Sequence, residues 1–232
     1  MQTLYWLSPT AFCCEDNGHC IMLDIRKDQY YLIERDDWTI ISPFIAKLQT
    51  PHVGHCSASP EKVQKLVQTL ICRGLLTPDG RQGKPLVYCK PHPPNSLFEQ
   101  IECDTPPSIR WYHPISIFFV GIFSQFLLTC IPLRIIIKLI KSGKRGSTTY
   151  TDNYIHAARV FQHLRPFLPK STVCLYDSLS FFFFCRLHGL RPDVVIGIRA
   201  EPFAAHCWTQ IEGIILNDVP ANILQYRPIM LI

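Results

Sequence analysis

Three side chains in the last third of the sequence are of the types that nucleophilic catalysis needs: Cys174, His206 and Asp218. A thiolate attacks a carbonyl carbon, a histidine within hydrogen-bond reach moves the proton, and a carboxylate on the other ring nitrogen holds the imidazole. That chemistry would be hydrolysis or transfer of an acyl group. The chain has eleven cysteines, and any of them could lie near a helix start by chance, so the thiol alone decides nothing.

Cys174 opens a predicted helix that runs to His188, is strongly apolar, and is ended by Gly189. At a helix start, the unpaired N–H groups and the helix dipole favour a negative charge and so lower the pKa of a thiol. The N–H groups of Cys174 and Leu175 are also free to face an oxyanion. The sequence therefore predicts a reactive thiolate at this position.

A predicted β-hairpin would bring His206 and Asp218 together. Its strands, 206–210 and 214–218, fold back across Ile211-Glu212-Gly213. A three-residue loop with its glycine in the left-handed conformation would pair His206 with Asp218 on one face. A two-residue turn at Glu212-Gly213 would place them on opposite faces. The register of the hairpin is therefore expected to decide whether the two side chains can meet.

Other polar residues nearby have simpler interpretations. His188 is expected to cap the end of the apolar helix, and Asp177 to complement its N-terminus. Asp193 reads as a residue that opens a strand, 193–198. Asn217 is expected to face the other side of its strand and to be structural, while Trp208 shares a face with the imidazole, as a core residue or as a shield for the pair.

The N-terminal part reads as three short strands followed by two helices. The strands are expected around Phe12, at 19–25 and at 29–34, with side chains that alternate in polarity. Asp36-Asp37 opens a helix predicted to reach Leu48, and a second helix, 60–73, begins after the N-cap candidate Ser59. A proline-rich connector, 79–114, cannot sustain regular structure and predicts a linker between domains at 1–78 and 115–232.

The most apolar run, 115–131, is followed by Pro132 and by a basic stretch that includes Lys138 and Lys141. Three interpretations are open: a buried helix of the second domain, which we favour, a membrane-surface helix covering 115–141, and a true span. At 1.5 Å per residue the run reaches only about 26 Å.

Composition narrows the function classes. Apolar residues make up 47% of the chain and the net charge is +5, which predicts a globular protein with no basic stripe for nucleic acid. The scattered, odd number of cysteines and the lack of a basic, apolar start predict a cytoplasmic protein with free thiols. No Cys-x-x-Cys pair exists and His52-x-x-His55-Cys56 lacks a fourth ligand, so no metal site is expected.

The C-terminal motifs resemble the lasso-peptide leader peptidases, the B2 proteins. The resemblance rests on Cys174-Leu175, the strand 194–198, the run 202–208 and Leu216-Asn217-Asp218. It implies a transglutaminase-like, papain-like cysteine protease domain over 115–232, with Cys174, His206 and Asp218 as its catalytic triad. Cys207 stands where that family usually has alanine.

The N-terminal part resembles the PqqD-like recognition element of the same pathway. This implies an α+β chain in which a small winged-helix-type domain binds the leader peptide as an added strand. The edge would be 29–34 and the other wall the helix 60–73. The candidate groove residues are Tyr31, Ile33, Val63, Leu66 and Val67, of which at least half are expected to belong to the core.

The two resemblances together imply the fused form of a peptidase that frees the amine of a lasso-peptide precursor for ring closure. The implied partners are the precursor leader and an asparagine-synthetase-like cyclase, with no cofactor in this chain and any ATP used by the cyclase. The expected location is the cytoplasm, including the inner face of the membrane. Two alternatives stay open: an acyltransferase of the transglutaminase type, and a peptide-delivery adaptor without catalysis.

Overall fold

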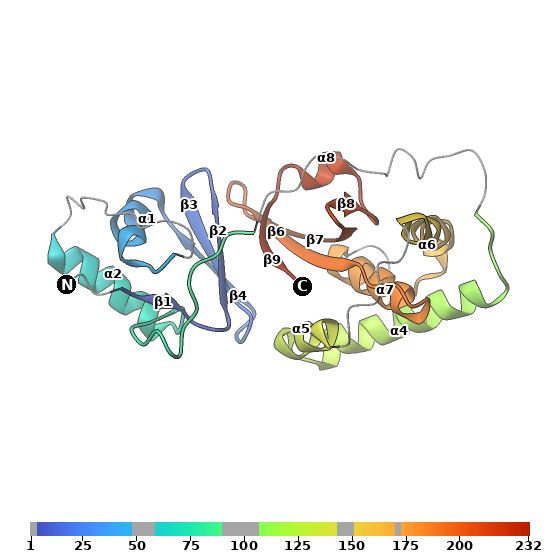
Figure 1. The fold of residues 1–232 in the computed structure, drawn as a ribbon, viewed down its shortest axis with the longest axis horizontal. Coiled ribbons are helices and arrows are strands. Elements are labelled where there is room, and N and C mark those ends of the chain that lie inside the picture. Colours follow the sequence, from blue (N-terminus) through green and yellow to red (C-terminus); the bar gives the residue numbers. More distant parts are fainter. Residues whose placement is uncertain (1–3, 48–58, 90–106, 143–150, 170–172) are drawn as a thin grey trace. The chain divides into compact units, whose positions relative to one another are not determined.

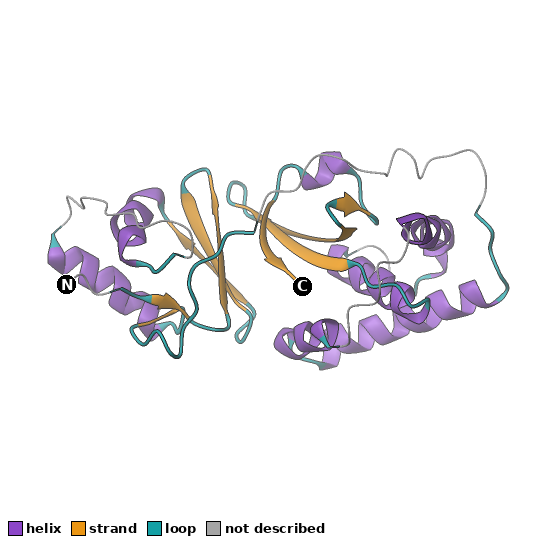
Figure 2. Cartoon of the chain, viewed as in Figure 1, coloured by secondary structure: helices purple, strands orange, loops and turns teal. Residues whose placement is uncertain are grey.

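The computed structural model describes residues 4–47, 59–89, 107–142, 151–169 and 173–232. By its internal contacts the chain divides into two compact units, which we describe one at a time. The first unit holds Met1–Lys90, Ile198–Ala204 and Arg227–Met230, and the second holds Pro91–Gly197, Ala205–Tyr226 and Leu231–Ile232. Helices and strands occur in both parts of the chain, so the fold is mixed α/β (Figure 2).

The first unit is built on an antiparallel sheet of β2 (Ala11–Asp16), β3 (His19–Asp24) and β4 (Gln29–Ile33), in the order β2-β3-β4 (Figure 1). These are the three strands that the alternating pattern predicted. Asn17 and Gly18 join the first two with φ angles of 51° and 82°. Two positive φ angles suit the two-residue hairpin turn whose twist matches its strands.

The first helix is shorter than predicted. α1 spans Arg35–Ile41 and passes into a 3-10 turn, η1, over Ser42–Phe44. Pro43 explains the difference, because a proline has no backbone N–H to continue the hydrogen bonds of an α-helix. Leu48, the expected end of this helix, lies outside the described residues.

The second helix is confirmed. α2 spans Pro60–Cys72, and the Ser59 hydroxyl accepts a hydrogen bond from the Lys62 N–H at 3.4 Å. A two-stranded ladder of β1 (Trp6–Leu7) and β5 (Leu76–Thr77) was not predicted, because strands of two residues carry no alternating pattern.

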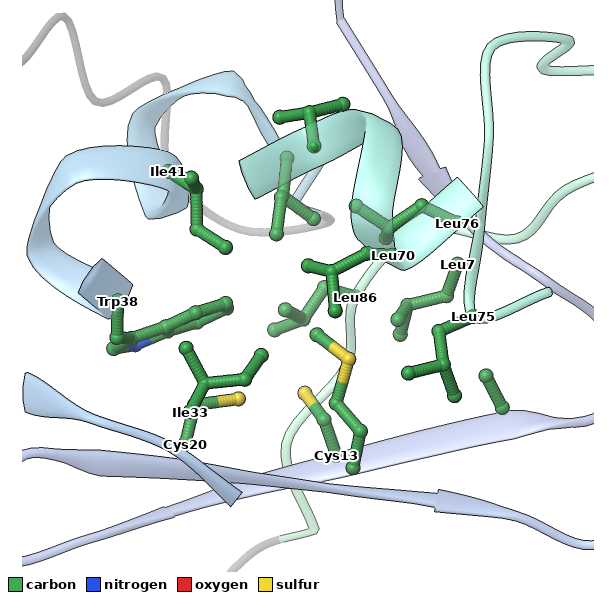
Figure 3. Packing of buried hydrophobic residues seen from close by; sticks show 14 residues of the cluster. Leu7, Cys13, Cys20, Ile33, Trp38, Ile41, Leu70, Leu75, Leu76 and Leu86 are labelled. Atoms are coloured by element: carbon green, nitrogen blue, oxygen red, sulfur yellow. The ribbon is translucent and has the colours of Figure 1, made fainter. Parts of the chain in front are cut away.

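The core of the first unit lies between its helices and its three-stranded sheet. Figure 3 shows Trp38 and Ile41 of α1 and Leu70 of α2 pointing toward Cys13 and Cys20 on the strands. The cysteines here are small buried apolar side chains, as expected.

The first part of the expected linker lies in the first unit. Leu86 is buried in the core, and its N–H donates to the carbonyl of Ala46 at 2.7 Å. Lys84 exchanges both backbone hydrogen bonds with Leu7. Residues 79–89 therefore belong to this unit despite Pro85, because the backbone groups beside this proline pair with neighbouring segments. Residues 90–106 of the expected linker lie outside the described part.

The second unit packs three long helices around a shared core, with α7 against both α4 and α6. Its helices are α4 (Tyr112–Cys130), α5 (Leu133–Lys141), α6 (Thr151–Leu164), the 3-10 turn η2 (Arg165–Phe167), α7 (Cys174–Leu187) and α8 (Pro220–Ile223). Gly121 lets α4 approach α7 closely, since a Cβ there would lie 2.8 Å from the Tyr176 hydroxyl.

A four-stranded sheet follows α7 in the sequence, with α8 between its last two strands. Its order is β8-β7-β6-β9, from β6 (Asp193–Arg199), β7 (Ala204–Ile211), β8 (Ile214–Ile215) and β9 (Arg227–Leu231). The strand predicted at 193–198 and the two predicted around Glu212-Gly213 are present, although β8 is shorter than expected.

Candidate active site

Cys174 is the first residue of α7, as predicted from the apolar pattern of that helix. A hydrogen bond from His206 lowers the pKa of its thiol, and this outweighs burial, which raises it. The backbone N–H groups of Cys207 and Leu175 also bond the sulfur and favour its charged form. The thiol is partly exposed, so it is both activated and accessible.

The imidazole of His206, on β7, lies between the thiol and a carboxylate. Its Nε2 is hydrogen-bonded to Oδ2 of Asp218. Because Nε2 is occupied, Nδ1 is the nitrogen that remains for Cys174. Burial lowers the pKa of His206, but the hydrogen bonds to Asp218 and Cys174 outweigh it and raise the pKa to about 9.

Asp218 is held on its other oxygen as well. Its Oδ1 accepts from the N–H of Val219 at 2.7 Å and from the side-chain amide of Asn222 at 2.9 Å. Burial raises the pKa of Asp218, yet the hydrogen bonds from His206, Asn222 and Val219 lower it overall. The carboxylate is therefore fixed and ionised beside the imidazole.

The register of the hairpin differs from the expected one. Gln210 pairs with Ile215 and Ile211 with Ile214, so the turn is the two-residue Glu212-Gly213, with φ angles of 49° and 86°. The expected three-residue loop, which would have paired His206 directly with Asp218, is wrong. Asn-Gly and Asp-Gly are the usual sequences for such a turn, and a glutamate at the first position concealed it.

The histidine and the aspartate still meet, because the second strand ends early. β8 stops at Ile215, and the chain bends over residues 216–218. The side-chain oxygen of Asn217 accepts from the Thr209 N–H at 2.7 Å, where a regular strand would offer a backbone carbonyl. The Leu216 N–H still donates to the Thr209 carbonyl at 3.0 Å, but the ladder ends there, and Asp218 can turn to the face that His206 occupies.

Asn217 was expected to face away from the site, and this expectation is corrected. Its amide group donates to Asp177 at 3.3 Å and to the Ser178 hydroxyl at 3.1 Å, both on α7. Arg165 donates to the other Asp177 oxygen at 2.8 Å. The asparagine thus ties the bend that carries Asp218 to the helix that carries the thiol.

Aromatic rings cover the imidazole. Trp208 and Tyr226 stack on His206 with ring centroids 6.2 and 5.1 Å away. Trp208 is fully buried, and a Cβ on Gly197 would lie 2.6 Å from its ring. The prediction that Trp208 shares a face with the histidine is confirmed, while Tyr226 was not predicted because nothing in the sequence around it marks a site.

The three side chains border one cavity of about 290 Å³. Its lining includes Arg165, Cys174, Asp177, His206, Asn217 and Asp218. A thiol, an imidazole and a carboxylate are joined in that order by hydrogen bonds, and this arrangement suits the transfer or hydrolysis of an acyl group. Among the described residues, no group of three or more His, Cys, Asp or Glu side chains is arranged to hold a metal ion. His52, His55 and Cys56 lie outside those residues.

The other polar residues that the sequence places near the site have structural roles. His188 is the C-cap of α7, as expected, and contacts the rings of His113 and Phe184. Asp193 begins β6. All nine cysteines that the structure describes are free thiols.

The five candidate groove residues lie in or against the core of the first unit. Ile33 and Val67 are buried core members, with 9% and 2% of their surface exposed. An enclosed side chain is unavailable to a bound peptide, so their assignment to the groove is corrected to a core role. Tyr31, Val63 and Leu66 are partly buried and pack against the same core.

The comparison with protein families points to the part of the chain that holds these three side chains. Residues 126–231 match the transglutaminase-like superfamily. The chain is also 30% identical over 86 residues to McjB, the microcin J25-processing protein of Escherichia coli. That similarity covers 34% of this chain and 40% of the relative, so the chain matches less than half of the relative's length. No solved structure matches the chain.

Proposed function

We propose that this protein is a cysteine peptidase that removes the leader peptide from a ribosomally made lasso-peptide precursor. The observation that carries the proposal is the meeting of Cys174, His206 and Asp218 at one cavity. The similarity to a protein named for the processing of microcin J25 supports a peptide substrate. The resemblance of the motifs to the lasso-peptide leader peptidases supports the class of precursor.

The proposed reaction begins with attack of the Cys174 thiolate on the carbonyl carbon of the last leader residue. Backbone N–H groups at the start of α7 stabilise the oxyanion, and His206 gives its proton to the leaving amine. Water then attacks the thioester with His206 as the base, which releases the leader carboxylate and the thiol. Asp218 keeps the imidazole oriented throughout.

The first unit is proposed to hold the leader as an added strand. β4 is the edge strand of its sheet among the described residues, and a leader would add to the sheet beside such an edge. The end of α2 lies beside this strand, since the Arg73 guanidinium lies 5.3 Å from the ring centroid of Tyr31. Leader capture would raise the effective concentration of the cleavage site.

The freed amine would pass to an asparagine-synthetase-like cyclase, which closes the ring. We assign no cofactor to this chain, and any ATP is proposed to be used by that partner. The cytoplasm is the proposed location, since the precursor is made there.

Cys174→Ala tests the proposal with a lasso-peptide precursor that carries its leader as substrate. We expect the variant to lose leader removal by about 10⁴-fold or more, because a triad without its nucleophile retains little rate. Mass spectrometry of the products measures this, and Cys130→Ala, at an exposed cysteine at the end of α4, is the matched control. Leader removal that continues unchanged in Cys174→Ala would exclude the peptidase and favour the adaptor.

Acyl transfer is a second candidate, favoured by the superfamily match. The same triad can pass the acyl group from Cys174 to an amine instead of water. The product masses distinguish the two, since hydrolysis leaves a free leader carboxylate and transfer leaves a new amide.

A further inference from the structure

The helix α4 is apolar on two faces, and the described residues of the protein cover one of them. His113, Ile117, Val120, Ser124 and Leu127 are buried and recur at helical spacing along the covered face. The opposite face carries seven exposed side chains, also at helical spacing: Trp111, Ile115, Phe118, Phe119, Ile122, Phe123 and Phe126. We favoured a buried helix for residues 115–131, and one face of α4 is indeed buried while the opposite face is exposed.

This exposed face is large for a water-soluble surface. Phe119 and Phe126 have 63% and 54% of their surface exposed, and Trp111 at the start of the helix has 81%. Aromatic and aliphatic side chains gathered in one stripe mark an interaction site, because isolated apolar residues are common on surfaces but continuous patches are not.

The covered face argues against a membrane span. α4 is the one helix among the described residues that is long and apolar enough to cross a bilayer, with a mean hydropathy of 1.6. However, Ile117 and Ser124 are fully buried and α4 packs along α7, so crossing would require the helix to leave its own core. A helix held in this way can present its free face to a membrane surface only by lying parallel to it.

The charges around α4 indicate which surface it meets. Residues 107–142 contain no aspartate or glutamate. Their cations, Arg110, Arg134, Lys138 and Lys141, are all exposed. In α5 the exposed Ile135 and Leu139 alternate with these cations, while Ile136, Ile137 and Ile140 face inward. Apolar side chains next to cations, without acids, complement anionic headgroups over acyl chains.

The two helices are held as one surface by the second unit. Arg191 donates from Nη2 to the carbonyls of Ile140 at 3.0 Å and Lys141 at 2.8 Å, which anchors the end of α5. Figure 1 shows α4 and α5 following one another along the same side of that unit. A second copy of the chain is a poor occupant, because it would bring four more cations against these four.

We propose that the exposed face of α4, with the cations of α5, docks this protein on the surface of a bilayer that contains anionic phospholipid. Trp111 and Tyr112 lie at one end of the face, and such rings favour the level of the headgroups. The docked helix lies in the plane of the interface, with its buried face still on α7. This inference is independent of the catalytic proposal, since none of its residues borders the cavity of Cys174.

Sedimentation of the full chain with lipid vesicles tests the proposal. Wild-type protein is expected to bind vesicles of phosphatidylcholine mixed with phosphatidylglycerol about tenfold or more tightly than pure phosphatidylcholine vesicles. Phe119→Ser with Phe126→Ser is expected to weaken binding to the mixed vesicles by at least about tenfold. Val87→Ser with Leu187→Ser, at two other exposed apolar positions, is the control and is expected to bind as wild type.

Charge-reversal variants test the role of the cations in the same vesicle experiment. Lys138→Glu with Lys141→Glu is expected to weaken binding to the mixed vesicles, while Lys65→Glu with Arg81→Glu is expected to leave it unchanged. Circular dichroism checks that each variant is folded. Cys174→Ala is expected to bind vesicles as wild type, which separates this proposal from the catalytic one.

Three results would overturn the proposal. The first is a wild-type chain that binds neither kind of vesicle, or both equally. The second is self-association of the wild type in the absence of lipid that the aromatic substitutions abolish, which would assign the face to a second copy. The third is resistance of the bound protein to alkaline carbonate, which would mean that α4 spans the bilayer.

Discussion

At the scale of single residues, the site depends on opposed shifts of two pKa values. A hydrogen bond from His206 lowers the pKa of Cys174, and the hydrogen bonds of His206 overcome burial and raise its own pKa to about 9. Each group stabilises the charged form of the other, so thiolate and imidazolium coexist between the two values. The ion pair also stabilises the fold: the His206 contribution is complete below its ordinary pKa of 6.5 and is lost as the pH rises through about 9.

The proposed peptidase should therefore show a bell-shaped pH profile of kcat/KM. The rising limb follows the lowered pKa of Cys174, and the falling limb follows His206 at about pH 9, where the proton for the leaving amine is lost. Asp218→Asn removes a carboxylate that raises the pKa of His206, so the falling limb should move to lower pH. Asp36→Asn, at an exposed acid in α1, is the control. A falling limb that stays in place in Asp218→Asn would mean that another group controls it.

At the scale of elements, the sequence located the catalytic candidates but not the route by which they meet. Cys174 at a helix start and a hairpin between His206 and Asp218 could be predicted, because helix ends and turns leave local signals. The early end of β8 could not, since it depends on whether the Asn217 side chain or a backbone carbonyl pairs with Thr209. That choice is made by Asp177 and Ser178 on α7, which are distant in the sequence.

Asn217→Ala tests whether the bend positions Asp218. The change leaves the N–H of buried Thr209 without its acceptor, which should lower the free energy of unfolding by about 1–3 kcal/mol. Loss of the bend should also lower kcat for leader cleavage by about 100-fold with little change in KM, because misplacement of Asp218 affects the imidazole and not the peptide. Chemical denaturation and steady-state kinetics measure the two effects.

Asn222→Ala is the matched control for this prediction. It removes a single hydrogen bond to Asp218, at an exposed asparagine, and leaves the bend intact. We expect a smaller loss of kcat than in Asn217→Ala. A destabilised Asn217→Ala protein whose kcat stays within about twofold of wild type would limit Asn217 to a role in stability.

At the scale of the whole molecule, sequence patterns predicted an α+β chain, and the structure mixes helices and strands in this way but moves the limits of its parts. Residues 79–89 read as linker because they open the proline-rich stretch 79–114, yet Leu86 completes the first core. The run 115–131 read as a core helix, but half of its circumference has no partner within the described chain. Periodicity could not separate these faces, because α4 is apolar all round and only the packing of α7 shows which side is covered.

The central claim is that Cys174, His206 and Asp218 act as one reactive unit, and alkylation of the intact protein tests it without any substrate. Mass spectrometry after brief treatment with iodoacetamide at neutral pH gives the rate at Cys174, with exposed Cys72 as the internal reference. The account predicts that Cys174 reacts faster than Cys72 in the wild type, and that His206→Ala removes most of this advantage. Equal rates at the two cysteines, unchanged by His206→Ala, would contradict it.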